Sequence, residues 1–84
     1  MASEVRKEQF RAARALLGWS QAKLAERAGM SLPTVKRFET GHGANVSAEA
    51  RQVLRAALET AGIEFTNGDA PGVRLHPRRR GKGK

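Results

Sequence analysis

Apolar residues recur at helical spacing along most of the chain, and glycines interrupt the pattern. In the first stretch Phe10, Ala13 and Leu17 lie three or four residues apart, with charged residues between them. This spacing predicts a helix from Ser3 to Leu17, which ends at Gly18. The first element is therefore expected to be an amphipathic helix with one buried face.

Two shorter helical patterns follow, and they are closely spaced. Ser20 and Ser31 can each accept a hydrogen bond from an unpaired backbone N–H at a helix start. Gly29 suits a left-handed turn between the helices, because it has no Cβ. We expect helices over about 20–28 and about 31–40. A short helix, a tight turn and a second helix form a helix-turn-helix, whose second helix enters the major groove of DNA.

A longer amphipathic stretch begins at Ser47, a residue type that favours helix N-termini. It predicts a fourth helix that runs to about Ala61 and stops at Gly62. Apolar positions at helical spacing are expected to face inward. These positions are Val53, Leu54, Ala57 and Leu58.

Beyond Gly62 the helical spacing ends, and apolar residues recur at every second position. Residues 63–66 and 73–75 each alternate between apolar and polar, and Asn67-Gly68 is a strong turn signal. We expect a small β-hairpin or a pair of short strands. An isolated two-stranded hairpin is marginal in water, so its apolar side chains need cover from the helices or from a second copy. These side chains are Ile63, Phe65, Val73 and Leu75.

A set of residues between Arg14 and Gly41 lies in the register of a known family. The set is Arg14, Leu17, Ser20, Gln21, Leu24, Ala25, Ala28, Gly29, Val35, Phe38, Glu39 and Gly41. It resembles the Cro-like (XRE) helix-turn-helix family, the group of the lambdoid phage repressors, and the flanking helices extend the resemblance to roughly 5–61. The resemblance implies a mostly α, four-helix, lambda-repressor-like DNA-binding domain over 1–61. A short β extension over 62–76 and a basic tail over 77–84, expected to be disordered because it has no apolar residue, complete the chain.

The candidate base readers lie on the second helix of the helix-turn-helix. Arg37 is the first candidate, because a guanidinium can bond both major-groove acceptors of guanine. Thr34 is a candidate for contact with a thymine methyl or a phosphate. Leu32 and Pro33 depart from the best-known family members, which have Gln or Ser there. They read thymine methyls by apolar contact, or Leu32 only packs on the turn; the sequence leaves both interpretations open.

Phosphate contacts are expected at the helix starts, the following loop and the tail. A helix N-terminus attracts anions, and the family resemblance implies a phosphate contact at the position of Gln21. An exposed Gln21 without a partner is the alternative. The loop after the recognition helix meets the DNA backbone in the family, although it is poor in charge here. The phosphate candidates are Ser20, Gln21, Lys36, Thr40, Asn45, Arg78, Arg79 and Arg80.

Arg14 and Glu39 match a partly buried ion pair of phage repressors, which ties the first helix to the recognition helix. The resemblance therefore implies a structural pair at these positions. Removing one partner of a buried pair strands a charge and is costly. We accordingly expect Glu39→Ala to destabilise the protein more than Arg37→Ala. The alternative is a separate solvated charge on each helix.

Charge is distributed unevenly. The net charge is +8, of which residues 1–69 contribute +2 and residues 70–84 contribute +6 without a single acidic residue. Such a cationic segment attracts polyanions by counterion release and does not read sequence. The simpler interpretation is a solubilising tail, but behind a helix-turn-helix the tail favours contact with DNA phosphates.

Several function classes find no support in the sequence. The chain has no Cys and no Tyr, and neither of its two His residues has a nearby ligand cluster, so we expect no metal and no cofactor. No paired carboxylates or phosphate-binding glycine loop supports catalysis. No apolar run approaches a membrane span, and the N-terminus lacks a signal-peptide core. We expect a cytoplasmic, nucleoid-associated protein that is not an enzyme.

The sequence favours a regulator that binds double-stranded DNA sequence-specifically, as a repressor of prokaryotic or phage origin. We expect a homodimer on a pseudo-palindromic operator, with residues 62–75 as a possible contact. Two alternatives stay open. One is the DNA-binding antitoxin of a toxin–antitoxin pair, with a protein partner on the basic C-terminal segment. The other is a protein–protein adaptor on the same fold.

Overall fold

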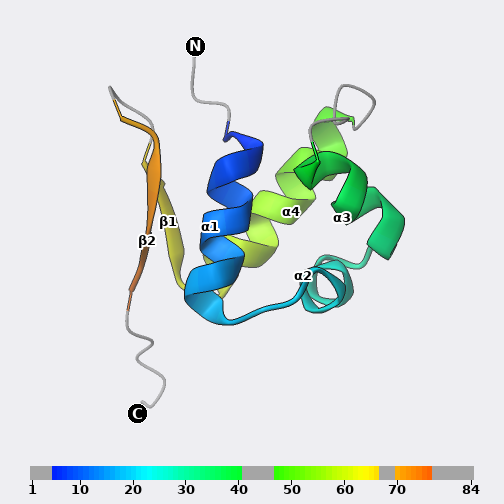
Figure 1. Cartoon of the computed structure of the whole chain (residues 1–84), viewed down its shortest axis with the longest axis horizontal. Helices are drawn as coiled ribbons and strands as arrows, with labels where there is room; N and C mark the ends of the chain where they lie inside the picture. Colours follow the sequence, from blue (N-terminus) through cyan, green and yellow to red (C-terminus); the bar gives the residue numbers. More distant parts are fainter. Residues whose placement is uncertain (1–4, 41–46, 67–69, 77–84) are drawn as a thin grey trace.

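The described residues of this computed structural model are 5–40, 47–66 and 70–76, and they form four helices and a two-stranded antiparallel hairpin (Figure 1). The mostly helical, lambda-repressor-like fold predicted from the sequence is confirmed. The helices are α1 (Lys7–Leu17), α2 (Gln21–Ala28), α3 (Leu32–Glu39) and α4 (Ala48–Thr60), and the strands are β1 (Ile63–Thr66) and β2 (Gly72–Leu75).

Helix α1 begins later than the sequence pattern predicts. The predicted start, Ser3, lies outside the described residues, and Arg6 has an extended backbone with φ −87° and ψ 159°. The side-chain Oε1 of Gln9 accepts a hydrogen bond from the Arg6 backbone N–H at 2.8 Å. This bond from the first turn back to the N-cap fixes the helix start at Lys7. The prediction that residues 5 and 6 are helical is therefore wrong.

A serine side chain caps the N-terminus of each of the other three helices. The Oγ atoms of Ser20, Ser31 and Ser47 each accept a hydrogen bond from the backbone N–H three residues later. Gly29 ends α2 with φ 69°, a left-handed conformation that a residue with a Cβ adopts only with strain. This turn gives α3 its sharp change of direction after α2.

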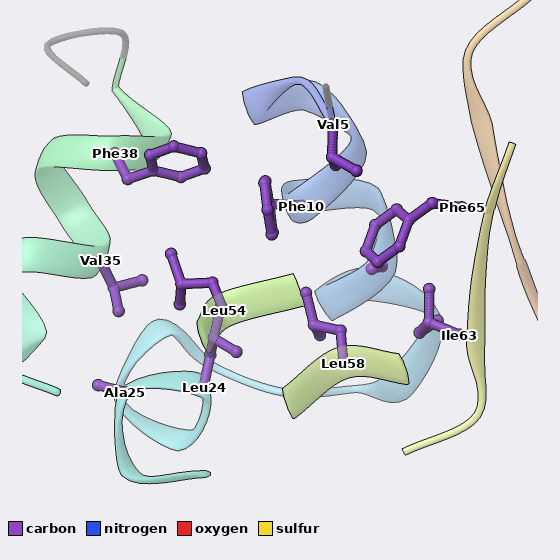
Figure 2. Packing of buried hydrophobic residues seen from close by; sticks show 11 residues of the cluster. Val5, Phe10, Leu24, Ala25, Val35, Phe38, Leu54, Leu58, Ile63 and Phe65 are labelled. Atoms are coloured by element: carbon purple, nitrogen blue, oxygen red, sulfur yellow. The ribbon is translucent and has the colours of Figure 1, made fainter. Parts of the chain in front are cut away.

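The hydrophobic core joins the helix-turn-helix and the hairpin through α1. The Phe10 ring lies between Phe38 of α3 and Phe65 of β1 (Figure 2), with centroid distances of 4.7 and 5.7 Å. Phe10 is fully buried, and neither neighbour is more than 9% exposed. One continuous core therefore stabilises both parts of the chain. Its other members are Val5, Ala13, Leu24, Ala25, Val35, Leu54, Leu58 and Ile63.

The hairpin packs against α1 and α4, with α1 between it and α3 (Figure 1). Its register pairs Ile63 with Leu75 and Phe65 with Val73. Ile63 and Phe65 are buried and Val73 is half-buried, so the helices supply most of the apolar cover that a lone hairpin lacks. Leu75, at the end of the second strand, is still 39% exposed in the single chain.

A buried amide fastens the hairpin to α1. The Gln9 Nε2 donates hydrogen bonds to the Thr66 carbonyl at 3.1 Å and to the Gly72 carbonyl at 2.9 Å. These carbonyls belong to opposite strands at the turn end of the hairpin. Because Gln9 is only 4% exposed, its amide satisfies the strands from inside the fold. The Gln9 side chain thus fixes the start of α1 and also holds the turn end of the hairpin against α1.

One residue of α4 that the sequence predicts to face inward is exposed in the structure. Leu54 and Leu58 are fully buried and Ala57 is half-buried, but Val53 is 43% exposed. Successive helix positions are about 100° apart, so Val53 lies at the margin of a face that Leu54 and Leu58 centre. Val53 lines a hollow there, opposite Trp19, Arg27 and Ala28, and does not enter the core. The prediction that Val53 points into the core is wrong.

Candidate nucleic-acid interface

Helix α3 buries one face and presents the other. Val35 is fully buried, and Phe38 and Glu39 are 4% and 1% exposed. Lys36 and Arg37 lie between them in the sequence and are exposed. The buried side chains fix the rotation of the helix about its axis, so the two cations point away from the domain. No carboxylate in the described part of the chain pairs with either cation.

The first turn of α3 contains a hydrogen bond between two hydroxyl groups, and a proline. The Ser31 Oγ accepts from the Thr34 backbone N–H at 3.3 Å and lies 2.8 Å from the Thr34 Oγ1. Pro33 is exposed and suits the first turn, where its missing N–H costs nothing. Leu32 and Thr34 are half-buried. All four predicted base readers, including Arg37, therefore lie on one short helix next to the turn.

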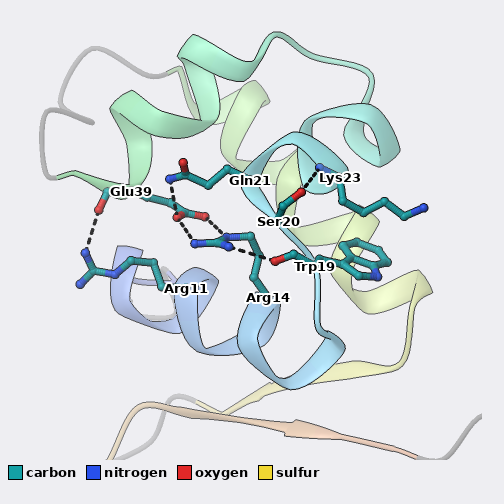
Figure 3. A network of polar contacts seen from close by, with 7 residues as sticks. All are labelled: Arg11, Arg14, Trp19, Ser20, Gln21, Lys23 and Glu39. Carbon is teal, nitrogen blue, oxygen red and sulfur yellow. Dashed lines mark hydrogen bonds and ion pairs between the residues drawn. The ribbon is translucent and has the colours of Figure 1, made fainter.

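A buried ion pair sets the position of this helix. The Arg14 Nε donates to the Glu39 Oε2 and the Arg14 Nη2 to the Glu39 Oε1, both at 2.8 Å (Figure 3). The Glu39 side chain is 1% exposed and that of Arg14 is 18% exposed. This two-point geometry is more directional than a single contact between charges. The structure thus brings the two predicted partners together, across α1 and α3.

Three further bonds extend the ion pair into a network (Figure 3). The Gln21 Nε2 donates to the Glu39 Oε1 at 3.1 Å, and the Arg11 Nη1 donates to the Glu39 backbone carbonyl at 3.0 Å. The Arg14 Nη1 donates to the carbonyl of Trp19 at 3.0 Å. The network therefore fixes the end of α3 against α1 and against the start of α2. Every buried side-chain polar atom of the described residues has a partner.

Sequence reasoning missed Arg11 as a member of this network. The apolar spacing of the first helix places this residue on the polar side. A usable signal is present, because Arg11 precedes Arg14 by three positions and so shares its face of the helix. The orphan carbonyls at a helix end need donors, and Arg11 supplies one to the last residue of α3.

Gln21 has an internal partner that the sequence did not indicate. Its amide has two N–H groups, and the bond to Glu39 uses one of them. The prediction that Gln21 contacts a phosphate stays a prediction. The alternative of a Gln21 without any partner is wrong, because the amide bonds the buried carboxylate.

The remaining phosphate candidates divide between described and undescribed parts of the chain. The Ser20 Oγ accepts from the Lys23 backbone N–H at 3.0 Å, beside the first turn of α2. Thr40 is exposed at the end of α3, and its Oγ1 donates to the Arg37 carbonyl at 3.2 Å. Outside the described residues lie Asn45, Arg78, Arg79 and Arg80.

The comparison with known families now bears on this geometry. A family model described as helix-turn-helix, of the XRE type, matches residues 10–60. The chain belongs to this family. The match runs from the Phe10 position of α1 through the end of α4, so it includes α2, the turn and α3. Members of the XRE-type family are DNA-binding transcriptional regulators. No curated protein is significantly similar to the chain.

The described residues hold neither a metal-ligand cluster nor a membrane-spanning helix. Those residues contain no group of three or more metal-ligating side chains. No helix among them is long and apolar enough to cross a lipid bilayer. The chemistry available at α3 is therefore hydrogen bonding, apolar contact and positive charge.

Proposed function

We propose that this XRE-type helix-turn-helix protein is a repressor that binds double-stranded DNA sequence-specifically, with α3 in the major groove. The supporting observation is the exposed pair Lys36 and Arg37 on a helix whose other face is fully buried. A short helix with a fixed rotation and free cations suits insertion between the phosphate backbones of a duplex. The buried network at Glu39 keeps α3 in that orientation.

Each exposed group of α3 has a proposed role. Arg37 reads a guanine through its two parallel N–H groups, and Lys36 contacts a phosphate. Thr34 already pairs its hydroxyl with Ser31, so its methyl is the group that meets a thymine methyl. Leu32 and Pro33 add apolar contact with thymine methyls. Ser20 and Gln21, at the start of α2, hold the flanking backbone through their N–H and O–H groups.

We further propose that two copies bind a pseudo-palindromic operator, with half-sites about one helical turn apart. The hairpin offers the contact between copies, because β2 is the edge of a two-stranded sheet. Edge strands pair readily with a second edge. The hairpin packs away from α3, so such a pairing leaves both recognition helices accessible.

Selection of oligonucleotides from a random pool tests the proposal directly. The parent protein should enrich a two-fold symmetric site, and Arg37→Ala should relax the preference at one base pair in each half-site, at a cost of about 1–3 kcal/mol. Arg55→Ala is the matched control, because it removes the same charge from α4, outside both α3 and the hairpin, where Arg55 pairs with Glu59 near the surface. An Arg37→Ala profile identical to that of the parent would remove Arg37 from the readers. A parent without any sequence preference would favour the adaptor.

The tail is tested separately through salt. Residues 77–84 contain five cations, and their replacement by Gln should weaken binding to every DNA sequence alike. The dependence of log affinity on log salt concentration should become shallower, by about 0.9 for each phosphate that the tail no longer neutralises. The measurement is a titration by fluorescence anisotropy at several salt concentrations. An unchanged slope would show that the tail does not contact phosphates.

A further inference from the structure

The described residues leave three large apolar side chains exposed, and all three border neighbouring hollows. Leu16 of α1 is 48% exposed, Val53 of α4 is 43% exposed and Leu75 of β2 is 39% exposed. Val53 lines one hollow, while Leu16 and Leu75 line another. Contiguous exposed apolar surface on a small domain marks an interaction site. Val53, which lies outside the core, is therefore a candidate contact residue for a partner.

The two hollows form one surface, because they share residues. Trp19, Arg27 and Ala61 line both. We call this combined area the Trp19 surface. Figure 3 shows that the Trp19 ring lies away from the Arg14–Glu39 pair. None of the residues that line it belongs to α3, so a partner bound here would leave the recognition helix free.

We propose that the Trp19 surface binds an acidic amphipathic helix of another protein. The proposal goes beyond DNA binding and does not depend on it. The shape supports a helix, because Val53 and Ala57 of α4 and the C-cap Ala61 follow one another at four-residue intervals and line the same hollow. The small alanines allow a second helix to approach closely, and the larger Val53 and Trp19 border them. Helices bind such grooves through apolar anchors at i, i+3, i+4 and i+7.

The charge of the surface indicates acidic groups on that helix. The Arg27 guanidinium lies 5.3 Å from the centroid of the Trp19 ring and is exposed. No carboxylate lines either hollow, and none in the described residues pairs with Arg27. A carboxylate of the partner helix can accept hydrogen bonds from the Arg27 guanidinium, while apolar side chains of the same helix pack on the Trp19 ring. His76 lines the second hollow, and its Nε2 lies 2.7 Å from the Glu64 carboxylate, so that carboxylate already has a partner.

Other occupants match the surface less well. Residues 77–84 follow directly after His76, but they contain cations, glycines and a proline without an apolar anchor. A second copy docked through the same surface would place two Arg27 guanidinium groups in one interface, with no lining carboxylate to neutralise them. Charge complementarity therefore favours a partner with acidic side chains over a second copy of this chain.

A displayed library of 14-residue peptides, free of Trp and Tyr, tests the proposal on the full chain. Selection on the parent should enrich apolar residues at helical spacing together with Asp and Glu. The enriched peptides should lose at least tenfold in affinity for Val53→Lys, which adds a bulky cation to the apolar stripe. They should bind Gln52→Lys as they bind the parent, since Gln52 is exposed on the same helix and lines neither hollow.

The single tryptophan of the chain supplies a direct readout. A synthetic version of the most enriched peptide should shift the Trp19 emission to shorter wavelength and saturate. Arg27→Gln should weaken this peptide severalfold, whereas a peptide with Gln in place of its acids should bind the parent and Arg27→Gln equally. Circular dichroism checks that each variant is folded. DNA affinity of the folded Val53→Lys protein should equal that of the parent.

Three results would overturn the proposal. The first is no enrichment on the parent beyond that on Val53→Lys. The second is enrichment of apolar peptides without a preference for acidic residues, because Arg27 would then have no role. The third is a dimer in sedimentation velocity that Val53→Lys converts to monomer and Gln52→Lys does not, because a second copy would then be the occupant.

Discussion

Helix α1 is attached to α3 on one side and to the hairpin on the other, and the two attachments differ in chemistry. Toward α3 the polar contact is a buried ion pair, Arg14 with Glu39, held by two bonds of 2.8 Å. Toward the hairpin the polar contact is a neutral amide, Gln9, which bonds two backbone carbonyls. Apolar packing is shared, because the Phe10 ring contacts aromatic rings on both sides.

The difference relates to what each side must hold in place. A guanidinium–carboxylate pair with two parallel bonds fixes angle as well as distance, and it acts at the end of the helix that carries the predicted base readers. The amide of Gln9 positions only the turn end of a hairpin that is already held by Ile63 and Phe65. We infer that the costly charged contact is used where orientation matters for DNA, and the neutral one where burial suffices.

Breaking the charged side should have the largest effect. Glu39→Ala leaves Arg14 as a largely buried charge without its partner, so we expect a loss of about 3–5 kcal/mol in the free energy of unfolding. Arg37→Ala is the control on the same helix and should change stability little, because Arg37 is exposed. Urea denaturation followed by circular dichroism measures both. Equal midpoints for the two variants would contradict the structural role of the pair.

Breaking the neutral side should cost less. Gln9→Ala removes the donor to the Thr66 and Gly72 carbonyls, and we expect a loss of about 1–3 kcal/mol in the free energy of unfolding. Affinity of the folded variant for a single half-site should stay at the parental value, since α3 keeps its own contacts. Gln52→Ala, on an exposed position, is the control. The same unfolding midpoint for both glutamine variants would show that the buried amide contributes nothing.

The smallest effect concerns an exposed carboxylate on the hairpin. The hydrogen bond between Glu64 and the His76 Nε2, at 2.7 Å, lowers the pKa of Glu64 below its usual value near 4.5, with Arg74 adding a smaller lowering. A lowered folded-state pKa stabilises the protein above that usual range, and the contribution is lost as the pH falls through the folded pKa.

Comparison with Glu64→Gln measures this contribution. As the pH falls from neutral to below 4.5, the parent should lose slightly more stability than Glu64→Gln, by less than the effect of Gln9→Ala. Unfolding midpoints in urea at several pH values give the difference. A larger acid loss in Glu64→Gln than in the parent would reverse the sign and exclude this account.

The sequence by itself determined the elements whose signals are local. Serines at the starts of α2, α3 and α4 cap a backbone N–H three residues away, and Asn67-Gly68 separates two alternating strands. Such contacts span only a few residues, so the pattern contains both partners. The likeness to XRE-type proteins around the helix-turn-helix is equally local, and it indicates the family correctly.

Only the tertiary structure decided which side of each element meets another. Gln9 is polar by sequence, but it is buried because Thr66 and Gly72 arrive from the other end of the chain. Val53 fits an apolar stripe by sequence, but it stays 43% exposed because it lines a hollow beside Trp19 and Arg27 and does not enter the core. Burial depends on partners far away along the chain, and a local period of apolar residues contains no information about where those partners lie.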